Sequence, residues 1–469
     1  MTGLVAAGPR VRTATLTMSC LAAVAGYSAV LVWLMSTRPY DVWGGALFAP
    51  LLVLGSLPLL RRAARDEPDG FFWLLLAALC LKMLASVARL VVAEGIYDGS
   101  ADAGAYAEEG ARLAEAYRQG VFTADIGREF IGTGGLRVIT GVLFAFTGPT
   151  SLGGYMVFSW WAFWGLVAFY KAFRTALPEG DHRRYARLLF FLPSMLYWPS
   201  SIGKDAWMLL GLGAAALGAA RLLRHRSGAF PMLVAGLAAT TIIRPHITSL
   251  VCVGLAAAYV FRRGRPSATL GPLSKPIGAA LLGILLVVVI GQAQTYFNVE
   301  DEEGTGATEV LDETAERTGT GGSEFEPVNA RSVSDVPAAI LAVMFRPFPW
   351  EAHNGQALIA SLEGLVMLGL LVTSWRRLAA LPRHLRRRPY LVLVTVYTLL
   401  FCVAFSSFGN FGILTRQRIQ LFPFALVLLA LPPAGRRRTI DITDQRGSAL
   451  RALGDPWGDQ ASVPSKRRH

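Results

Sequence analysis

Long apolar runs recur along this chain, and they constrain its fold more than any other feature. A run of about 20 apolar residues can cross the hydrocarbon core of a membrane as a helix, because a helix satisfies its own backbone hydrogen bonds. Of the 469 residues, 53% are hydrophobic and only 16% are charged, and the mean hydropathy is +0.44. This composition predicts an all-α polytopic membrane protein and argues against a soluble multidomain protein.

Twelve apolar runs are candidates for transmembrane helices, of which Leu188 to Pro199 is short. The other eleven are Thr15 to Met35, Val42 to Leu60, Gly70 to Val92, Leu152 to Phe173, Trp207 to Leu223, Ala229 to Ile243, Ile247 to Phe261, Pro276 to Gln292, Gln356 to Trp375, Tyr390 to Ser406 and Ile419 to Leu431. A further stretch, Val138 to Phe146, is too short to span, and we expect a re-entrant or surface segment there. The sequence thus predicts about twelve transmembrane helices.

The distribution of basic residues predicts the orientation in the membrane. Cytoplasmic loops carry an excess of Lys and Arg, so we interpret the net charge of +13 as a sign of topology and not of nucleic-acid binding. The basic clusters are Arg61 to Arg65, Lys171 to Arg187, Arg221 to Arg226, Arg262 to Arg265, Arg376 to Arg388 and Arg436 to Arg438. If they are cytoplasmic, both termini are cytoplasmic too, and the chain is a multi-pass membrane protein.

This topology divides the chain into six regions. We expect N-terminal spans in residues 1–92, an external loop with an amphipathic helix in 93–151, and a central bundle in 152–293. An acidic, partly flexible external loop in 294–355, further spans in 356–434 and a disordered cytoplasmic tail in 435–469 follow. The four cysteines lie inside apolar runs without paired spacing, so no disulfide or zinc site is indicated. No cofactor is expected, and a divalent cation is left open.

Five short polar segments fall on the predicted outer side, where basic residues are normally scarce. Arginines and carboxylates gathered there indicate an anionic substrate. The segments contain Asp98 and Asp102; Lys204; Arg244 and His246; Arg346, Trp350 and His353; and Arg416 and Arg418.

Asp98 and Asp102 stand at the start of the predicted amphipathic helix, Ala101 to Gln119. A carboxylate at a membrane surface can serve as the general base that takes a proton from an acceptor hydroxyl. Aspartate is also favoured at the N-terminus of a helix, where it caps the backbone. Both roles are open from the spacing alone.

The basic members of these segments are candidate phosphate ligands. Arg244 follows one apolar run directly and can bind a phosphate through two parallel hydrogen bonds, although a proline turn with a snorkelling arginine gives the same pattern. Lys204 either neutralises Asp205 or contacts the same phosphate. Arg416 and Arg418 are costly at this depth unless they face an anion or snorkel to the headgroups.

Two further sets are supporting candidates. Arg346, Trp350 and His353 combine a cation with aromatic faces, which suits sugars and phosphates but also an interfacial aromatic belt. Lys82 lies near the middle of a predicted span, where a charge usually faces the bundle interior and needs a partner. With no obvious mid-membrane carboxylate to pair it, we expect Lys82 to stabilise an entering lipid phosphate.

Three stretches resemble bacterial membrane glycosyltransferases of the GT-C type and polymerases of exported polysaccharides. They are DAGAY at Asp102 to Tyr106, FFLPSMLYWPSSIGKDAW at Phe190 to Trp207, and IIRPHITSL at Ile242 to Leu250. The similarity covers residues 93–263 and the segment at Arg416. In the usual pattern the aspartate follows the first span, whereas here it follows the third.

The resemblance implies a glycosyltransferase that uses a sugar on a polyprenyl phosphate or diphosphate at the outer leaflet. The acceptor would be a glycan or a lipid-linked glycan. Asp102 or Asp98 would act as base, with Tyr106 beside it in the substrate site, while Arg244, His246, Arg416 and Arg418 would hold the lipid phosphate. A polymerase that joins lipid-linked repeat units and a flippase or other transporter are the alternatives, although a transporter should carry its polar residues near the midplane.

Overall fold

The computed structural model describes residues 9–95, 102–123, 125, 130–261, 280, 283, 325–328, 330 and 332–432. Within these residues the chain forms helices and turns and no β-strand, which confirms the all-α prediction. The predicted tail in 435–469, most of the acidic loop and nearly all of the run Pro276 to Gln292 lie outside the described residues.

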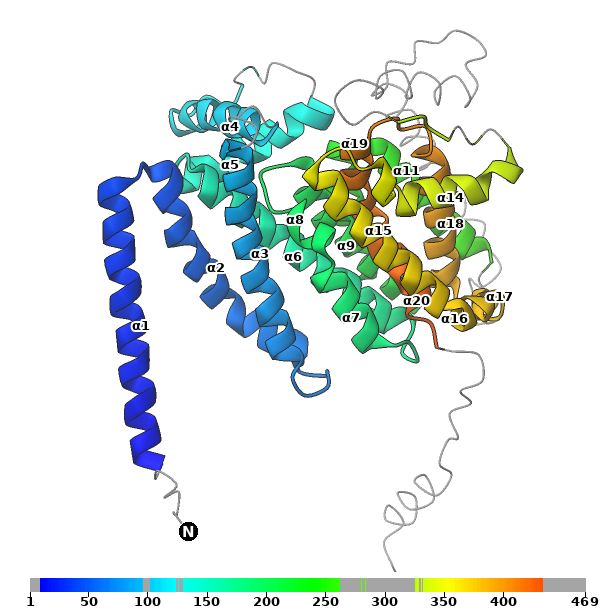
Figure 1. The fold of residues 1–469 in the computed structure, drawn as a ribbon, viewed down its shortest axis with the longest axis horizontal. Coiled ribbons are helices and arrows are strands. Elements are labelled where there is room, and N and C mark those ends of the chain that lie inside the picture. Colours follow the sequence, from blue (N-terminus) through cyan, green and yellow to red (C-terminus); the bar gives the residue numbers. More distant parts are fainter. Residues whose placement is uncertain are drawn as a thin grey trace, which may run out of the picture.

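The N-terminal half begins with three long helices and ends in a tight bundle (Figure 1). The helices are α1 (Pro9–Thr37), α2 (Tyr40–Ala64), α3 (Phe71–Gly95), α4 (Asp102–Arg118), α5 (Gly135–Thr147), α6 (Ser151–Ala176), α7 (His182–Phe191), α8 (Pro193–Tyr197), α9 (Lys204–Leu223), α10 (Ala229–Ile243) and α11 (Pro245–Val260). A short π-helical turn, η1 (Phe130–Gly134), precedes α5.

The C-terminal half packs against α9 and α11 on one side of the bundle (Figure 1). Its elements are η2 (Val333–Asp335), α14 (Val336–Phe345), η3 (Pro349–Glu351), α15 (Gly355–Thr373), α16 (Trp375–Ala379), α17 (Leu381–Leu385), α18 (Pro389–Ala404), α19 (Phe411–Gln417), η4 (Arg418–Gln420) and α20 (Phe422–Leu429). In Figure 1, α4 and α19 lie at one end of the bundle, and α16 and α17 lie at the other. We call these the α4–α19 end and the α16–α17 end.

Small residues bring the central helices α6 and α9 into close contact. A Cβ atom on Gly213 would lie 2.2 Å from the carbonyl oxygen of Gly165, and one on Gly165 would lie 2.3 Å from that of Leu209. Membrane helices commonly use such glycines because lipid offers no hydrophobic drive, and close backbone contact then supplies the packing energy. The α6–α9 pair therefore forms the rigid centre on which the polar ends are built.

Seven helices of the described chain are long and apolar enough to cross a membrane, which supports a membrane protein but not the predicted twelve spans. They cover Thr17–Thr37, Tyr40–Ala64, Phe71–Gly95, Phe130–Thr147, Ser151–Ala176, Lys204–Leu223 and Gly355–Thr373. Four shorter apolar helices, α10, α11, α14 and α18, have 10 to 17 residues.

Proline breaks account for part of the difference. The predicted span Leu188 to Pro199 is split into α7 and α8, because Pro193 begins a new helix after the extended residue Leu192. The predicted span Ile419 to Leu431 starts as the 3₁₀ turn η4 and continues as α20, with Pro423 near its start. Proline removes a backbone donor and so separates two short helices where the apolar pattern alone predicts one.

The predicted amphipathic helix is confirmed as α4, which packs on α5 through a glycine face. Gly110 lies against Thr140, and Gly141 of α5 lies against Leu113. The apolar stretch Val138 to Phe146 is part of α5, which has 13 residues. Together with η1, α5 reaches the length of a transmembrane helix. However, Ile131 and Gly132 in η1 have non-helical backbone angles. The continuous helix is therefore α5 alone, which is about 20 Å long.

Candidate functional site

Four of the five predicted polar segments meet at the α4–α19 end of the bundle. Asp102 begins α4, and Asp205 lies in the first turn of α9. Arg244 separates α10 from α11, and Arg416 lies in α19. Ion pairs join these four residues into one cluster, which we call the Asp205 network.

Asp205 is the centre of this network. Its side chain is only 3% exposed. One carboxylate oxygen accepts a hydrogen bond from Arg244 Nη1 at 3.2 Å, and the other accepts one from Arg416 Nε. A buried carboxylate stays charged only when paired in this way, so Asp205 fixes the positions of both guanidinium groups.

Asp102 forms the exposed edge of the network. Arg416 Nη1 donates to Asp102 Oδ2 at 2.9 Å, and the Asp102 side chain is 63% exposed. Asp205 is the main cause that raises the pKa of Arg416 above its ordinary value, with Asp102 adding to it. Arg416 thus stays a permanent cation between a buried and an exposed carboxylate.

Local backbone breaks place these side chains. Arg244 has an extended φ of −144° because it ends α10, and Pro245 occupies the first turn of α11, where the missing N–H of a proline is harmless. The side chain of Asn410 caps α19 by accepting from the backbone N–H groups of Gly412 and Ile413. Each functional group therefore stands at a helix end, not in the middle of a span.

Lys204 is turned away from Asp205, contrary to the pairing considered for it. Its Nζ donates to the hydroxyl of Thr133 in η1 at 2.9 Å. Consecutive residues of a helix point in different directions, which explains why Lys204 binds η1 while Asp205 binds the arginines. The cations Lys204, Arg244 and Arg416 thus lie at the same end as the carboxylates Asp102 and Asp205. The formal net charge of these five groups is +1, which favours the binding of an anion.

Tyr106 and His246 flank the network. Tyr106 lies one turn after Asp102 in α4 and is buried; burial, followed by the charge of Asp102, raises the pKa of its phenol. His246 lies close enough to Arg244 and Lys204 for their charges to act on it, and its ring is 6.4 Å from that of Phe405. Tyr106 thus lies beside Asp102, and His246 lies beside two of the cations.

Arg418 has a different role from Arg416. It is buried, and its Nη1 donates to the carbonyl oxygens of Met344 at 3.1 Å and Arg346 at 2.8 Å. Burial lowers the pKa of its guanidinium. Because these contacts hold the end of α14, the expectation that Arg418 is a phosphate ligand gives way to a structural role.

We expect Arg418→Gln to destabilise the protein by roughly 1–3 kcal/mol, because a buried and a partly buried carbonyl oxygen lose a charged donor. Thermal unfolding in detergent measures the loss. Arg112→Gln is the comparison, since it removes an arginine of α4 whose ion pair with Glu109 is at the surface and contributes little to folding. Equal stability of Arg418→Gln and the wild type would contradict this role.

Arg346 has several partners in the protein. Arg346 pairs with Glu351 at 2.7 Å and donates to the Glu326 carbonyl oxygen at 3.1 Å. Its guanidinium also lies 4.4 Å from the centre of the Phe325 ring. The guanidinium of Arg346 thus contacts Glu351 of its own segment and residues 325–326, while Arg418 of η4 binds the Arg346 carbonyl oxygen.

Trp350 and His353 extend from this segment toward the surface. Trp350 is exposed and stacks on Phe348, with ring centres 4.9 Å apart. His353 is exposed as well. An exposed tryptophan stacked on a half-buried phenylalanine suits either an interfacial belt or a sugar face, so Trp350 and His353 lie at the rim of the site and not in the network.

Lys82 belongs to a separate buried cluster. It is 1% exposed, and its Nζ contacts the Ser200 hydroxyl at 3.2 Å and the carbonyl oxygens of Leu196 and Pro199 at 3.4 and 3.5 Å. Lys82 therefore holds the turn between α8 and α9. The expected contact with an entering phosphate has no counterpart in this geometry, because the ammonium group is enclosed by protein.

The sequence interpretation missed two acidic residues. Asp205 was considered only as a neutraliser of Lys204, although a carboxylate in the first turn of an apolar helix indicates a partner from elsewhere. Glu363 is a mid-span carboxylate in α15, contrary to the expectation that there is none. It accepts from the Ser194 backbone N–H at 2.7 Å and so holds the start of α8. Asp98 lies outside the described residues.

Within the described part of the chain, no group of three or more His, Cys, Asp or Glu side chains could hold a metal ion. Comparisons with protein-family models, with curated proteins and with solved structures found no match.

Proposed function

We propose that the chain is a membrane glycosyltransferase that moves a sugar from a polyprenyl-phosphate-linked donor to a glycan or lipid-linked acceptor. The observation that carries this proposal is the Asp205 network. It combines an exposed carboxylate, Asp102, with two arginines fixed by one buried carboxylate. We propose further that this end faces the outside of the bacterial cytoplasmic membrane.

The reaction needs one base and one anion site. The acceptor hydroxyl oxygen attacks the anomeric carbon of the donor sugar while Asp102 takes the hydroxyl proton. The bond between that carbon and the phosphate oxygen breaks, and the electron pair stays on the phosphate. Arg416 and Arg244, which Asp205 fixes, would stabilise this growing charge, and such prearranged cations commonly supply the largest share of catalysis.

Asp102 would take the proton and Arg416 would bind the phosphate, and the two side chains are in contact. Arg416 contacts Asp102 at 2.9 Å, so a phosphate bound to Arg416 would lie close to the base. Asp205 keeps its two arginines in place during this exchange, which makes it a positioning residue. Lys204 adds a third cation from the side of η1.

The test is release of sugar from lipid in proteoliposomes. The purified protein is incubated with extracted polyprenyl-linked sugars and a glycan acceptor, and the lipid and product fractions are separated. Sugar leaving the lipid supports a transferase, and product length separates single-sugar transfer from joining of repeat units. Movement of intact lipid-linked sugar across the bilayer, without release, would instead support the transporter.

We expect Arg244→Lys to raise the KM for the lipid-linked donor about 10- to 100-fold, with a smaller change in kcat. A lysine can pair with Asp205 but cannot also present the planar fork that binds two phosphate oxygens. Initial rates over a range of donor concentrations measure the change. Arg221→Lys, at the other end of α9, is the matched control, and an unchanged KM in Arg244→Lys would argue against donor binding there.

The orientation can be tested with cysteines at both ends of the bundle, in a background without the native cysteines. We expect a membrane-impermeant maleimide to label Thr123→Cys and Gly412→Cys, both at exposed positions, in intact cells. Asp69→Cys, in the loop between α2 and α3, should react only after the cells are permeabilised. The reverse pattern would place the Asp205 network on the cytoplasmic side.

A further inference from the structure

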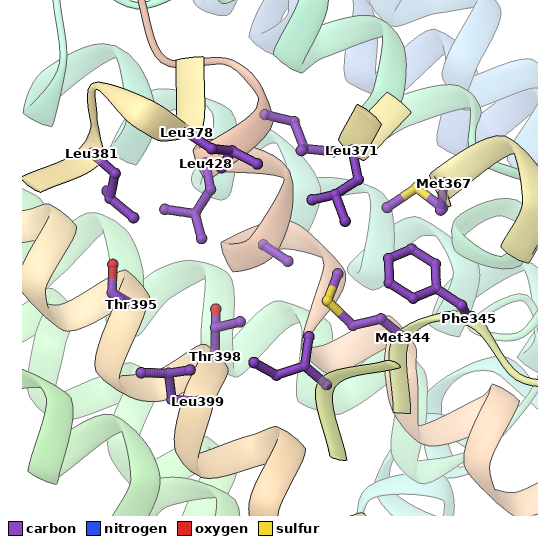
Figure 2. A pocket seen from close by; sticks show the side chains of 13 residues that line it. Met344, Phe345, Met367, Leu371, Leu378, Leu381, Thr395, Thr398, Leu399 and Leu428 are labelled. Carbon is purple, nitrogen blue, oxygen red and sulfur yellow. The ribbon is translucent and has the colours of Figure 1, made fainter. Parts of the chain in front are cut away.

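An apolar cavity of about 180 Å³ lies in the C-terminal half of the bundle, between α14, α15, α16, α17, α18 and α20. Met344 and Met367 line one side of it, and Leu378, Leu381 and Leu428 line the other (Figure 2). An apolar cavity of 150 Å³ stays dry and accepts hydrocarbon. This cavity is of that kind and slightly larger.

Two threonines are the only polar side chains on the wall. The hydroxyls of Thr395 and Thr398 have no hydrogen-bond partner in the described protein. They are too few to fix a polar ligand, which needs several convergent groups. Leu399 continues the wall to the surface, where it is exposed, so the cavity suits a hydrocarbon chain that enters from the membrane.

The wall at Leu378 and Leu381 belongs to the most basic segment of the structure. Arg383, Arg386 and Arg387 follow directly, are exposed, and have no carboxylate partner among the described residues. By contrast, Arg377 pairs with Asp181 at 3.0 Å and Arg388 with Glu179 at 2.8 Å. Three unpaired guanidinium groups beside an apolar cavity are complementary to an anion with a hydrocarbon tail.

An aromatic residue marks the level of the membrane surface at this place. Trp375 begins α16, is exposed, and carries the guanidinium of Arg376 at 5.7 Å from its ring centre. Tryptophan is enriched at the headgroup level, which puts the arginines among lipid headgroups and the cavity among acyl chains. Clusters of Lys and Arg beside membrane helices attract anionic lipids.

We infer that this site binds an anionic phospholipid, with one acyl chain in the cavity and the headgroup phosphate on Arg383, Arg386 and Arg387. Its arginines lie at the α16–α17 end, opposite the Asp205 network (Figure 1), and the cavity extends from there to Met344 and Phe345 of α14. The site is therefore distinct from the proposed donor site and does not depend on transferase activity.

The test compares lipids retained by the purified full-length protein. The protein is equilibrated in detergent with equal amounts of phosphatidylglycerol and phosphatidylcholine of the same acyl chains, and native mass spectrometry counts the bound lipids. We expect the wild type to retain phosphatidylglycerol preferentially. The triple variant Arg383→Gln, Arg386→Gln, Arg387→Gln should bind it about tenfold or more weakly.

The matched control removes three exposed arginines at the end of α2, in the variant Arg61→Gln, Arg62→Gln, Arg65→Gln, and should retain the lipid. Thr398→Leu and Thr395→Phe reduce the cavity without changing charge and should lower retention as well, with Thr398→Leu the milder change for folding. Equal retention of the two lipids by the wild type, or equal loss in both triple variants, would overturn the inference.

Discussion

Replacing Asp205 by asparagine is expected to abolish sugar transfer and to destabilise the protein. The substitution keeps the shape of the side chain but leaves Arg244 and Arg416 without the buried charge that pairs them. Removing one partner of a buried ion pair costs roughly 3–5 kcal/mol, and two arginines share this carboxylate. Thermal unfolding in detergent and sugar release in proteoliposomes measure the two effects.

Two variants serve as controls for Asp205→Asn. Asp181→Asn removes a carboxylate that pairs with Arg377 at the α16–α17 end, and it should leave transfer intact. Asp205→Glu keeps the charge and should recover part of the stability, although one added methylene displaces both arginines. Wild-type transfer in Asp205→Asn would show that the fixed arginines are not needed.

Asp102→Asn should also abolish transfer, but with little change in stability. A general base contributes about 10²- to 10⁴-fold to a rate, whereas an exposed ion pair contributes only about 0–1 kcal/mol to folding. Asparagine is as good a helix cap as aspartate, so a loss of activity cannot come from a lost cap. Initial rates at saturating donor, together with unfolding curves, separate the two roles.

Glu109→Gln is the matched control for Asp102→Asn. Glu109 lies in the same helix and pairs with Arg112 at 3.0 Å, so its loss removes one carboxylate and one exposed ion pair from α4. We expect near-wild-type transfer. Full activity in Asp102→Asn would remove Asp102 as the base and leave only its contact with Arg416.

The sequence predicted the helical class, a helix at the position of α4 and the polar segments, four of which meet at the α4–α19 end. Helices can be predicted from the apolar pattern because they depend mainly on the local sequence. The predicted run Ala229 to Ile243 and helix α10 even share their bounds. The count of spans was less predictable, because Pro193 divides one run and the backbone turns at Ile131 and Gly132 interrupt another.

The partners within the site could not be predicted from the sequence. Arg416 and Arg418 are two residues apart and have the same chemistry, yet one joins the Asp205 network and the other binds the end of α14. Lys204 and Asp205 are adjacent, yet they bind different elements. Such differences depend on which helix packs against each face, which is a property of the tertiary structure.

Lys82 shows the same limit for buried charges. A lysine in the middle of a span predicts a buried partner or a ligand, and the spacing alone favours neither. Three oxygen atoms of the α8–α9 turn contact its ammonium group, and they belong to a segment more than 100 residues later in the chain. Lys82 thereby holds the segment that leads into α9, whose first residues are Lys204 and Asp205.

The most direct test of the proposed transfer is the appearance of the leaving group. Proteoliposomes containing the wild type or Asp102→Asn receive a donor labelled in both sugar and lipid phosphate, together with a glycan acceptor. We expect the wild type to release one polyprenyl phosphate or diphosphate for each sugar transferred, and Asp102→Asn to release neither above the protein-free background. Intact donor in the wild-type reaction, with acceptor present, would contradict the proposal.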